Sequence, residues 1–249
     1  MNLCVFLAVP LVIFAPPIPP LTAADTRADF LKLIDRPRVP LAPEIEEAPP
    51  GPDGLTRLTF TYAADATNRV PAILLKSSAA PSAVGLLSPA ATDATRSPSS
   101  SGPASSNGSV ASPRRPVIIV LHGTGGTKES ELPFLTELAH AGFIAVAIDG
   151  RYHGARSKSG KGSADYIDAI LRTFRTGREK PFFYDTVWDV MRLVDYLETR
   201  DDVDPKRIGL FGISKGGIET YLTAAVDSRI AAAVPCIAVE SFRWAVENN

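Results

Sequence analysis

Residues 207–217 read Arg207-Ile208-Gly209-Leu210-Phe211-Gly212-Ile213-Ser214-Lys215-Gly216-Gly217 and carry the clearest structural signal in the sequence. Its first five residues are mostly apolar, as in a strand that is covered on both faces of a parallel sheet. Glycines at 212, 216 and 217 then mark a sharp turn, and apolar residues at helical spacing continue to Val226. The pattern predicts a buried strand, a tight turn and a helix in direct succession.

Ser214 stands on this turn in a G-x-S-x-G pattern, within the strand–turn–helix context that the pattern requires. So sharp a turn forces strained backbone angles, and a Cβ at Gly212 or Gly216 would collide with the adjoining strand or helix. The turn lifts the Ser214 hydroxyl clear of the sheet, while the backbone N–H of Lys215 at the helix start can stabilise an oxyanion. We therefore expect a nucleophilic serine; the alternative is a glycine-rich turn in which the serine is incidental.

A second loop, His122-Gly123-Thr124-Gly125-Gly126, follows the apolar run 117–121. It can bring the N–H of Gly123 or Thr124 to the same oxyanion, and two donors from separate loops form an oxyanion hole. His122 lies beside the strand end, so we expect its ring to hold the loop by hydrogen bonds. A catalytic role for His122 is the less favoured alternative.

Strands and helices alternate outward from these two loops. The runs 55–62 and 70–75 alternate as an antiparallel pair, and further strands are expected at 117–121, 143–148, 207–211 and 230–239. Helical spacing is seen in 132–139, 184–197 and 215–226. This order predicts an α/β fold with a mixed, mostly parallel sheet and helices on both faces, whose ligands bind at the carboxyl ends of the strands.

Three further segments differ in composition from the alternating strands and helices. Residues 1–24 contain an apolar run of signal-peptide length but no preceding Lys or Arg, so secretion or organellar import and a cytoplasmic location both remain open. Residues 25–54 are rich in proline and acids, which predicts an extended N-terminal arm. Residues 77–116 consist mainly of Ser, Ala, Pro and Gly, which predicts a disordered insertion within one domain that spans 55–249.

Overall composition excludes several classes of protein. The 249 residues carry 26 basic and 27 acidic side chains, so nothing draws the molecule to nucleic acid or to an anionic membrane. No apolar run is long enough to predict a stable membrane span. Two cysteines, Cys4 and Cys236, support no disulfide framework. We expect a small-molecule partner, with no cofactor and no metal.

Four motifs stand together in this sequence: His122-Gly123, Asp149-Gly150-Arg151-Tyr152-His153-Gly154, Asp202-Val203-Asp204-Pro205 and Gly212-x-Ser214-x-Gly216-Gly217. As a set they resemble the α/β-hydrolase superfamily, in the branch shared by prolyl-oligopeptidase-type (peptidase S9) enzymes, dienelactone hydrolases and acetyl xylan esterases. The resemblance covers about residues 55–245 apart from the insertion. It implies hydrolysis of an ester or amide substrate through an acyl-enzyme on Ser214. His122, Asp149 and His153 are expected to brace the loops.

The sequence departs from this family after Ser214. Members carry an acid and then a histidine beyond the nucleophile, whereas the three histidines here, His122, His140 and His153, all precede it. We therefore expect a C-terminally truncated domain that lacks the last strands and has little activity. The uncharged run 230–239 would then be a bare sheet edge through which chains self-associate.

Two rival interpretations belong to other classes. The first is a binding module with the same fold that keeps the pocket without turnover. The second is a nucleotide-binding α/β domain, because Gly123-x-Gly125-Gly126 opens a helix and Asp149 ends the next strand. The third glycine of that fingerprint is missing, since position 128 is Lys.

Overall fold

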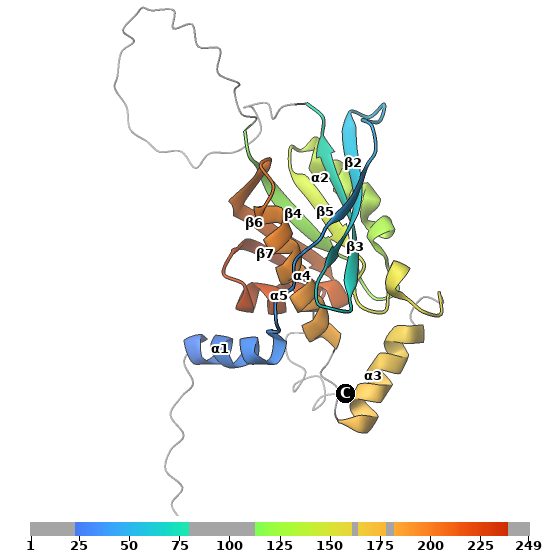
Figure 1. Ribbon diagram of the computed structural model, residues 1–249, viewed down its shortest axis with the longest axis vertical. Coiled ribbons are helices and arrows are strands. Elements are labelled where there is room, and N and C mark those ends of the chain that lie inside the picture. Colours follow the sequence, from blue (N-terminus) through green and yellow to red (C-terminus); the bar gives the residue numbers. More distant parts are fainter. Residues whose placement is uncertain (1–22, 80–112, 161–163, 178–181, 239–249) are drawn as a thin grey trace, which may run out of the picture.

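A seven-stranded mixed sheet forms the centre of the molecule in the computed structural model, which describes residues 23–79, 113–160, 164–177 and 182–238 (Figure 1). Its strand order is β1-β2-β3-β5-β4-β6-β7. The first three strands pair antiparallel with their neighbours up to β5, and β5, β4, β6 and β7 run parallel. The strands are β1 (Glu44–Glu47), β2 (Leu55–Ala63), β3 (Arg69–Ser77), β4 (Arg115–Leu121), β5 (Ile144–Ile148), β6 (Val203–Ile213) and β7 (Ile230–Cys236).

Apolar runs place the parallel strands at the centre of the fold. All five residues of β5 are buried, and β4 pairs with β5 on one side and with β6 on the other. Strands that are covered on both faces need such continuous apolar sequence. The predicted mixed, mostly parallel sheet and its antiparallel 55–62 and 70–75 pair are confirmed.

Helices cover both faces of the sheet and produce two separate apolar clusters. On one face, α4 (Phe182–Glu198) and α5 (Lys215–Val226) build the larger cluster, in which Trp188 is fully buried. On the other face, α2 (Leu132–His140) contributes Leu135 and Ala139 to the smaller cluster. Fully burying one large apolar side chain contributes about 1.5–3 kcal/mol, so these clusters dominate the stability of the fold.

The predicted extended arm over 25–54 is partly wrong, because its first part is helical. Helix α1 (Ala23–Ile34) packs Phe30, Leu31 and the buried Ile34 against the larger cluster. Burial of this apolar face compensates for the ordering of the helix. The rest of the segment is extended and includes β1, which is exposed along its length.

The bounds of the predicted insertion at 77–116 also change. Ser77 is the last residue of β3, and Arg115 begins β4. The Arg115 guanidinium donates hydrogen bonds to the carbonyl oxygens of Ser77 and Ala79, which holds the two strand ends together. The central part, residues 80–112, lies outside the described residues.

A second helix, besides α1, was not expected from the sequence. Helix α3 (Ala164–Thr176) extends away from the body of the molecule (Figure 1) and exposes Ile167, Ile170, Leu171 and Phe174.

Within the described residues, no helix combines the length and apolar character needed to cross a bilayer.

Strand β7 is the outermost strand on its side of the described sheet, next to β6. Most of its side chains are exposed, and Val234 is 51% exposed. The predicted strand at 230–239 therefore exists over Ile230–Cys236, while Val239 lies outside the described residues.

Candidate active site

Ser214 occupies the junction between β6 and α5 with a backbone conformation that L-residues rarely adopt. Its φ is 55° and its ψ is −116°, and it is the N-cap residue of α5. Its N–H donates to the Cys236 carbonyl at 2.8 Å, and its own carbonyl accepts from the N–H of Ile218 at 3.0 Å. Such strain persists only where surrounding contacts enforce it, and it is concentrated at functional sites.

Gly212, Gly216 and Gly217 flank Ser214 in the strand–helix turn, called the elbow below, and close approach of other backbone atoms requires glycine at these positions. A Cβ on Gly212 would lie 2.2 Å from the Gly216 carbonyl oxygen, and a Cβ on Gly216 would lie 2.0 Å from the Leu121 carbonyl oxygen. A Cβ on Gly217 would lie 2.6 Å from the Cys236 carbonyl oxygen. All three neighbouring atoms are backbone and cannot move aside, so the steric expectation for Gly212 and Gly216 is confirmed.

The loop after β4 approaches the elbow directly. A Cβ built on Gly123 would lie 3.9 Å from the Ser214 Cβ and 3.5 Å from the Ile213 carbonyl oxygen. Thr124 is exposed in the turn that the Gly126 N–H closes onto the Gly123 carbonyl at 3.1 Å. The first N–H groups of α5, including that of Lys215, have no acceptor within their own helix. The loop after β4 and the start of α5 thus both lie next to Ser214.

Both ring nitrogens of His122 are engaged by backbone. The Gly150 N–H donates to Nε2 at 3.0 Å, so the proton lies on Nδ1, which donates to the Gly123 carbonyl at 2.8 Å. The side chain is buried, and burial together with the nearby Lys215 ammonium lowers the pKa of His122 to about 3. His122 therefore stays neutral and joins the loops after β4 and β5, with no ring nitrogen left to accept a proton from Ser214.

Asp149 is fully buried and accepts several hydrogen bonds. One carboxylate oxygen accepts from the Lys128 N–H at 2.9 Å, and the other accepts from Lys128 Nζ at 2.7 Å and from the Ala155 N–H at 3.0 Å. In a nucleotide-binding domain the corresponding carboxylate accepts a hydrogen bond from a ribose hydroxyl. The Asp149 carboxylate is buried and already accepts hydrogen bonds from the protein, so a ribose cannot reach it. This arrangement argues against the nucleotide-binding alternative.

His153 lies beside His122, with 5.0 Å between the ring centroids. Its Nδ1 donates to the Arg151 carbonyl at 2.7 Å, while Nε2 is buried without a partner among the described residues. Burial lowers the pKa of His153 below its ordinary value. His140, the third histidine, ends α2 and is exposed.

The side chain of Lys215 turns away from the solvent. Its Nζ lies 2.9 and 3.1 Å from the two oxygens of Glu219, one helical turn later, and both side chains are almost wholly buried. Burial raises the pKa of Glu219, and the Lys215 ammonium opposes that rise. Sequence reasoning used only the backbone of Lys215; the i,i+4 spacing of Lys and Glu was the signal for this pair.

No group of three or more His, Cys, Asp or Glu side chains that could hold a metal ion occurs among the described residues. The described part of the candidate site contains the strained Ser214, the adjacent loop at Gly123 and the buried side chains of His122, Asp149, His153 and Lys215.

Comparison with known proteins places this geometry in a family. The family model for acetyl xylan esterase (AXE1) matches residues 105–245. The chain belongs to the acetyl xylan esterase family. Together with the sheet order and its solved structural neighbours, this membership makes the chain an α/β-hydrolase of the esterase type and confirms the expected superfamily.

Two solved members share the fold. The acetyl xylan esterase from Paenibacillus sp. R4 aligns with a TM-score of 0.57 at 18% identity, over 94% of this chain and 65% of that enzyme. Acetyl xylan esterase 1 from Thermoanaerobacterium sp. JW/SL YS485 aligns with a TM-score of 0.50 at 18% identity, over 84% of this chain and 54% of that enzyme.

Among curated sequences, YtaP of Bacillus subtilis (strain 168) is 31% identical over 128 residues, which are 46% of this chain and 40% of YtaP. The chain thus spans about two fifths of the length of this relative.

Proposed function

We propose that this chain carries the nucleophilic half of a carboxylic ester hydrolase that forms an acyl-enzyme on Ser214. The observation that carries the proposal is the φ of 55° at Ser214, at the strand–helix junction and beside Gly123. A strained serine in this position is the arrangement that exposes a hydroxyl to a substrate carbonyl. Membership of the acetyl xylan esterase family supports an acetylated carbohydrate as the ester substrate.

In the proposed reaction, the Ser214 oxygen attacks the ester carbonyl carbon, and the hydroxyl proton passes to a base. The negative charge that develops on the carbonyl oxygen is stabilised by the N–H of Lys215 and by that of Gly123 or Thr124. Collapse of the tetrahedral intermediate breaks the bond to the alcohol, which leaves with a proton. Water then releases the acetate from Ser214 by the reverse sequence of proton transfers.

The proposed reaction needs a base that takes the proton of the Ser214 hydroxyl. No histidine follows Ser214, and both ring nitrogens of His122 are already bonded to backbone. His122, Asp149 and His153 are proposed to hold the loops around the oxyanion hole. Loss of a triad member costs several powers of ten in rate, so this chain alone should turn over slowly.

The test is labelling of the 249-residue chain with a fluorophosphonate probe, followed by mass spectrometry of the modified peptide. We expect slow labelling on Ser214 that is absent in Ser214→Ala and unchanged in Ser228→Ala, because Ser228 is an exposed serine outside the elbow. Label on another residue, with Ser214 unmodified, would contradict the assigned nucleophile. Binding of acetylated xylo-oligosaccharide with no label at all would favour the non-catalytic binding module.

The same chain should hydrolyse nitrophenyl acetate only slowly. Fast hydrolysis that Ser214→Ala abolishes would show that His153 or His122 serves as the base after all. His153→Gln and His122→Gln would then identify which ring accepts the proton.

A further inference from the structure

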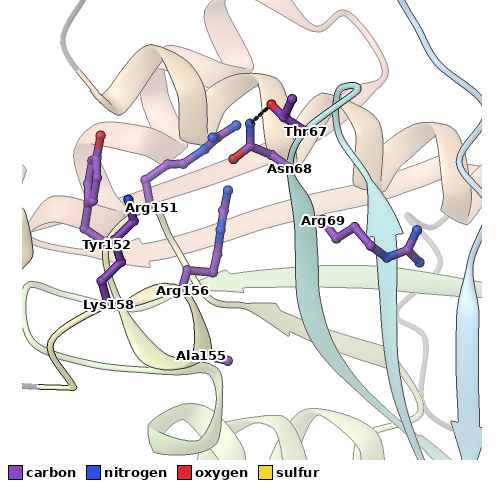
Figure 2. Close-up of a pocket in the computed structure, with 8 residues that line it drawn as sticks. All are labelled: Thr67, Asn68, Arg69, Arg151, Tyr152, Ala155, Arg156 and Lys158. Atoms are coloured by element: carbon purple, nitrogen blue, oxygen red, sulfur yellow. Dashed lines mark hydrogen bonds between the residues drawn. The ribbon is translucent and has the colours of Figure 1, made fainter.

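A basic pocket of about 410 Å³ lies at the tip of the β2–β3 hairpin, against the loop that follows β5. The hairpin contributes Asn68 and Arg69, and the loop contributes Arg151, Arg156 and Lys158 (Figure 2). A volume of several hundred Å³ is the size that holds a small organic ligand. Nothing in the proposed ester hydrolysis uses these side chains.

The lining is strongly cationic. All of its charged side chains are basic, namely Arg69, Arg151, Arg156 and Lys158. In Figure 2 the Arg69 guanidinium points away from the other three, and it pairs with Glu44 at 3.3 Å. Three cations therefore remain to face the pocket.

Carboxylates pair with two of those three cations. Asp189 is fully buried and binds Arg151 through two hydrogen bonds of 2.9 Å each, and it also accepts from Arg156 Nη1 at 2.6 Å. Asp65 lies farther away, at 3.5 Å from Arg151, and is shared with Arg36 at 3.6 Å. Asp165 accepts from the Lys158 N–H at 2.6 Å, but the exposed Lys158 ammonium forms no ion pair with a described residue. Lys158 is thus the pocket cation whose charged group has no carboxylate partner among the described residues.

One guanidinium donor in this pocket lacks an acceptor. The Arg156 side chain is 9% exposed, and its Nη2 is buried with no hydrogen-bond partner among the described residues. A buried charged donor without an acceptor costs free energy, which a bound acceptor would recover. The planar guanidinium is the group best suited to oxyanions, because it donates parallel hydrogen bonds to carboxylate or phosphate oxygens.

From the cationic lining and the unpartnered Arg156 Nη2 we infer that this pocket binds the oxyanion group of a small ligand, a carboxylate or a phosphate. The unpaired Lys158 ammonium attracts the anion, and Arg156 and Lys158 donate to it. The pocket lies beside the carboxyl end of β5. Ser214 follows the carboxyl end of β6, at the same end of the parallel strands. Strand β4 separates β5 from β6, so the ends of these strands are about 10 Å apart and the anion does not occupy the oxyanion hole.

The test is calorimetric titration of the 249-residue chain at low ionic strength with two probes, inorganic phosphate and acetate. Saturable binding of either supports the site, and a preference of about tenfold or more identifies the phosphate or the carboxylate class. Ser214→Ala should bind like the wild-type chain, because the site does not use the nucleophile. This independence separates failure of the anion site from failure of the proposed ester hydrolysis.

Matched lysine variants test the location. Lys158→Gln should weaken binding about five- to tenfold, whereas Lys206→Gln, the same change on an exposed residue at the opposite end of β6, should leave it within about twofold. Arg156→Lys keeps a positive charge next to Asp189 but removes the planar guanidinium with its paired N–H donors. It should therefore weaken anion binding more than Lys158→Gln does, without unfolding the chain. Absence of saturable binding of both probes, or equal loss in both lysine variants, would overturn the proposal. A crystal soaked in phosphate that shows only water at Arg156 Nη2 would overturn it too.

Discussion

The Nε2 atom of His122 accepts a hydrogen bond from the Gly150 N–H at 3.0 Å, and this contact ties the loop after β4 to the loop after β5. Removing the ring leaves that N–H without its partner and takes one of the two donors from the Gly123 carbonyl, which keeps the Gly126 N–H. We expect His122→Ala to lower the free energy of unfolding by about 2–4 kcal/mol, measured by urea denaturation. His140→Ala, on an exposed ring, should change it by less than about 0.5 kcal/mol. Equally small losses of unfolding free energy in His122→Ala and His140→Ala would mean that other contacts hold the loops after β4 and β5 together.

The depressed pKa values of the buried histidines make stability depend on pH. Burial lowers the pKa of His122 to about 3 and also lowers that of His153, whereas both rings titrate near 6.5 in the unfolded chain. Below pH 6.5 the unfolded state binds protons at these histidines that the folded state does not bind. The free energy of unfolding therefore falls as the pH falls towards 3. We expect His122 alone to contribute a loss of about 1.4 kcal/mol per pH unit between pH 6 and 4.

This pH effect has a direct control. A His122→Asn chain that folds should show a smaller decline in unfolding free energy between pH 6 and 4 than the wild type does. The difference between the two slopes reports the proton that His122 does not take up when folded. Parallel curves for the two proteins would show that His122 titrates normally in the folded state.

The approach of Gly216 to Leu121 gives a steric prediction. A Cβ at 216 would lie 2.0 Å from a backbone carbonyl oxygen, whereas one at Gly123 meets nothing closer than 3.5 Å. We expect Gly216→Ala to lower the thermal unfolding midpoint sharply or to prevent folding, and Gly123→Ala to lower it by only a few degrees. Similar midpoints for the two variants would mean that the elbow relaxes.

For the buried Lys215–Glu219 pair, we expect substitution of both residues to destabilise the chain less than substitution of one residue alone. Glu219→Gln leaves a buried ammonium without its carboxylate, so it should cost about 3–5 kcal/mol of stability. Lys215→Met with Glu219→Leu removes both charges, retains the backbone N–H at 215 and should recover most of that loss. A double-mutant cycle in denaturant measures the coupling, and additive losses would contradict a direct interaction.

The order of strands and helices was accessible from the sequence because it depends on local periodicity. The bounds of α5 agree with the predicted 215–226, and the strand expected at 207–211 lies within β6. Ser214 and its glycines could be recognised for the same reason, since the G-x-S-x-G pattern and its strand–turn–helix context lie in consecutive positions.

Contacts that cross the sheet were not accessible in this way. Asp149 meets Lys128 from 21 residues away, and Asp189 meets Arg151 from 38 residues away. These pairings exist only because β5 lies beside β4 and because α4 packs under the loop after β5. Helix α1 was missed for a related reason: its apolar face is stable only against the cluster that it covers.

The exposed strand β7 supports a prediction about association, which stays a proposal. Its outer edge has no strand neighbour among the described residues, and Val234 is half exposed. We expect the chain to self-associate through this edge and Val234→Lys to shift it towards monomer, as measured by light scattering after size exclusion. Phe174→Lys, on the exposed face of α3, is the control. A monomer at high concentration in the wild-type chain would contradict the proposal.

The hydrogen bonds from Arg115 to Ser77 and Ala79 have a practical consequence for engineering. They clamp the chain where it leaves β3 and where it enters β4, at the sheet edge opposite Ser214. Both points lie the full length of the strands away from Ser214. A fluorophore, an affinity tag or a carbohydrate-binding module attached next to Ala79 would therefore start from the end of the described sheet opposite Ser214.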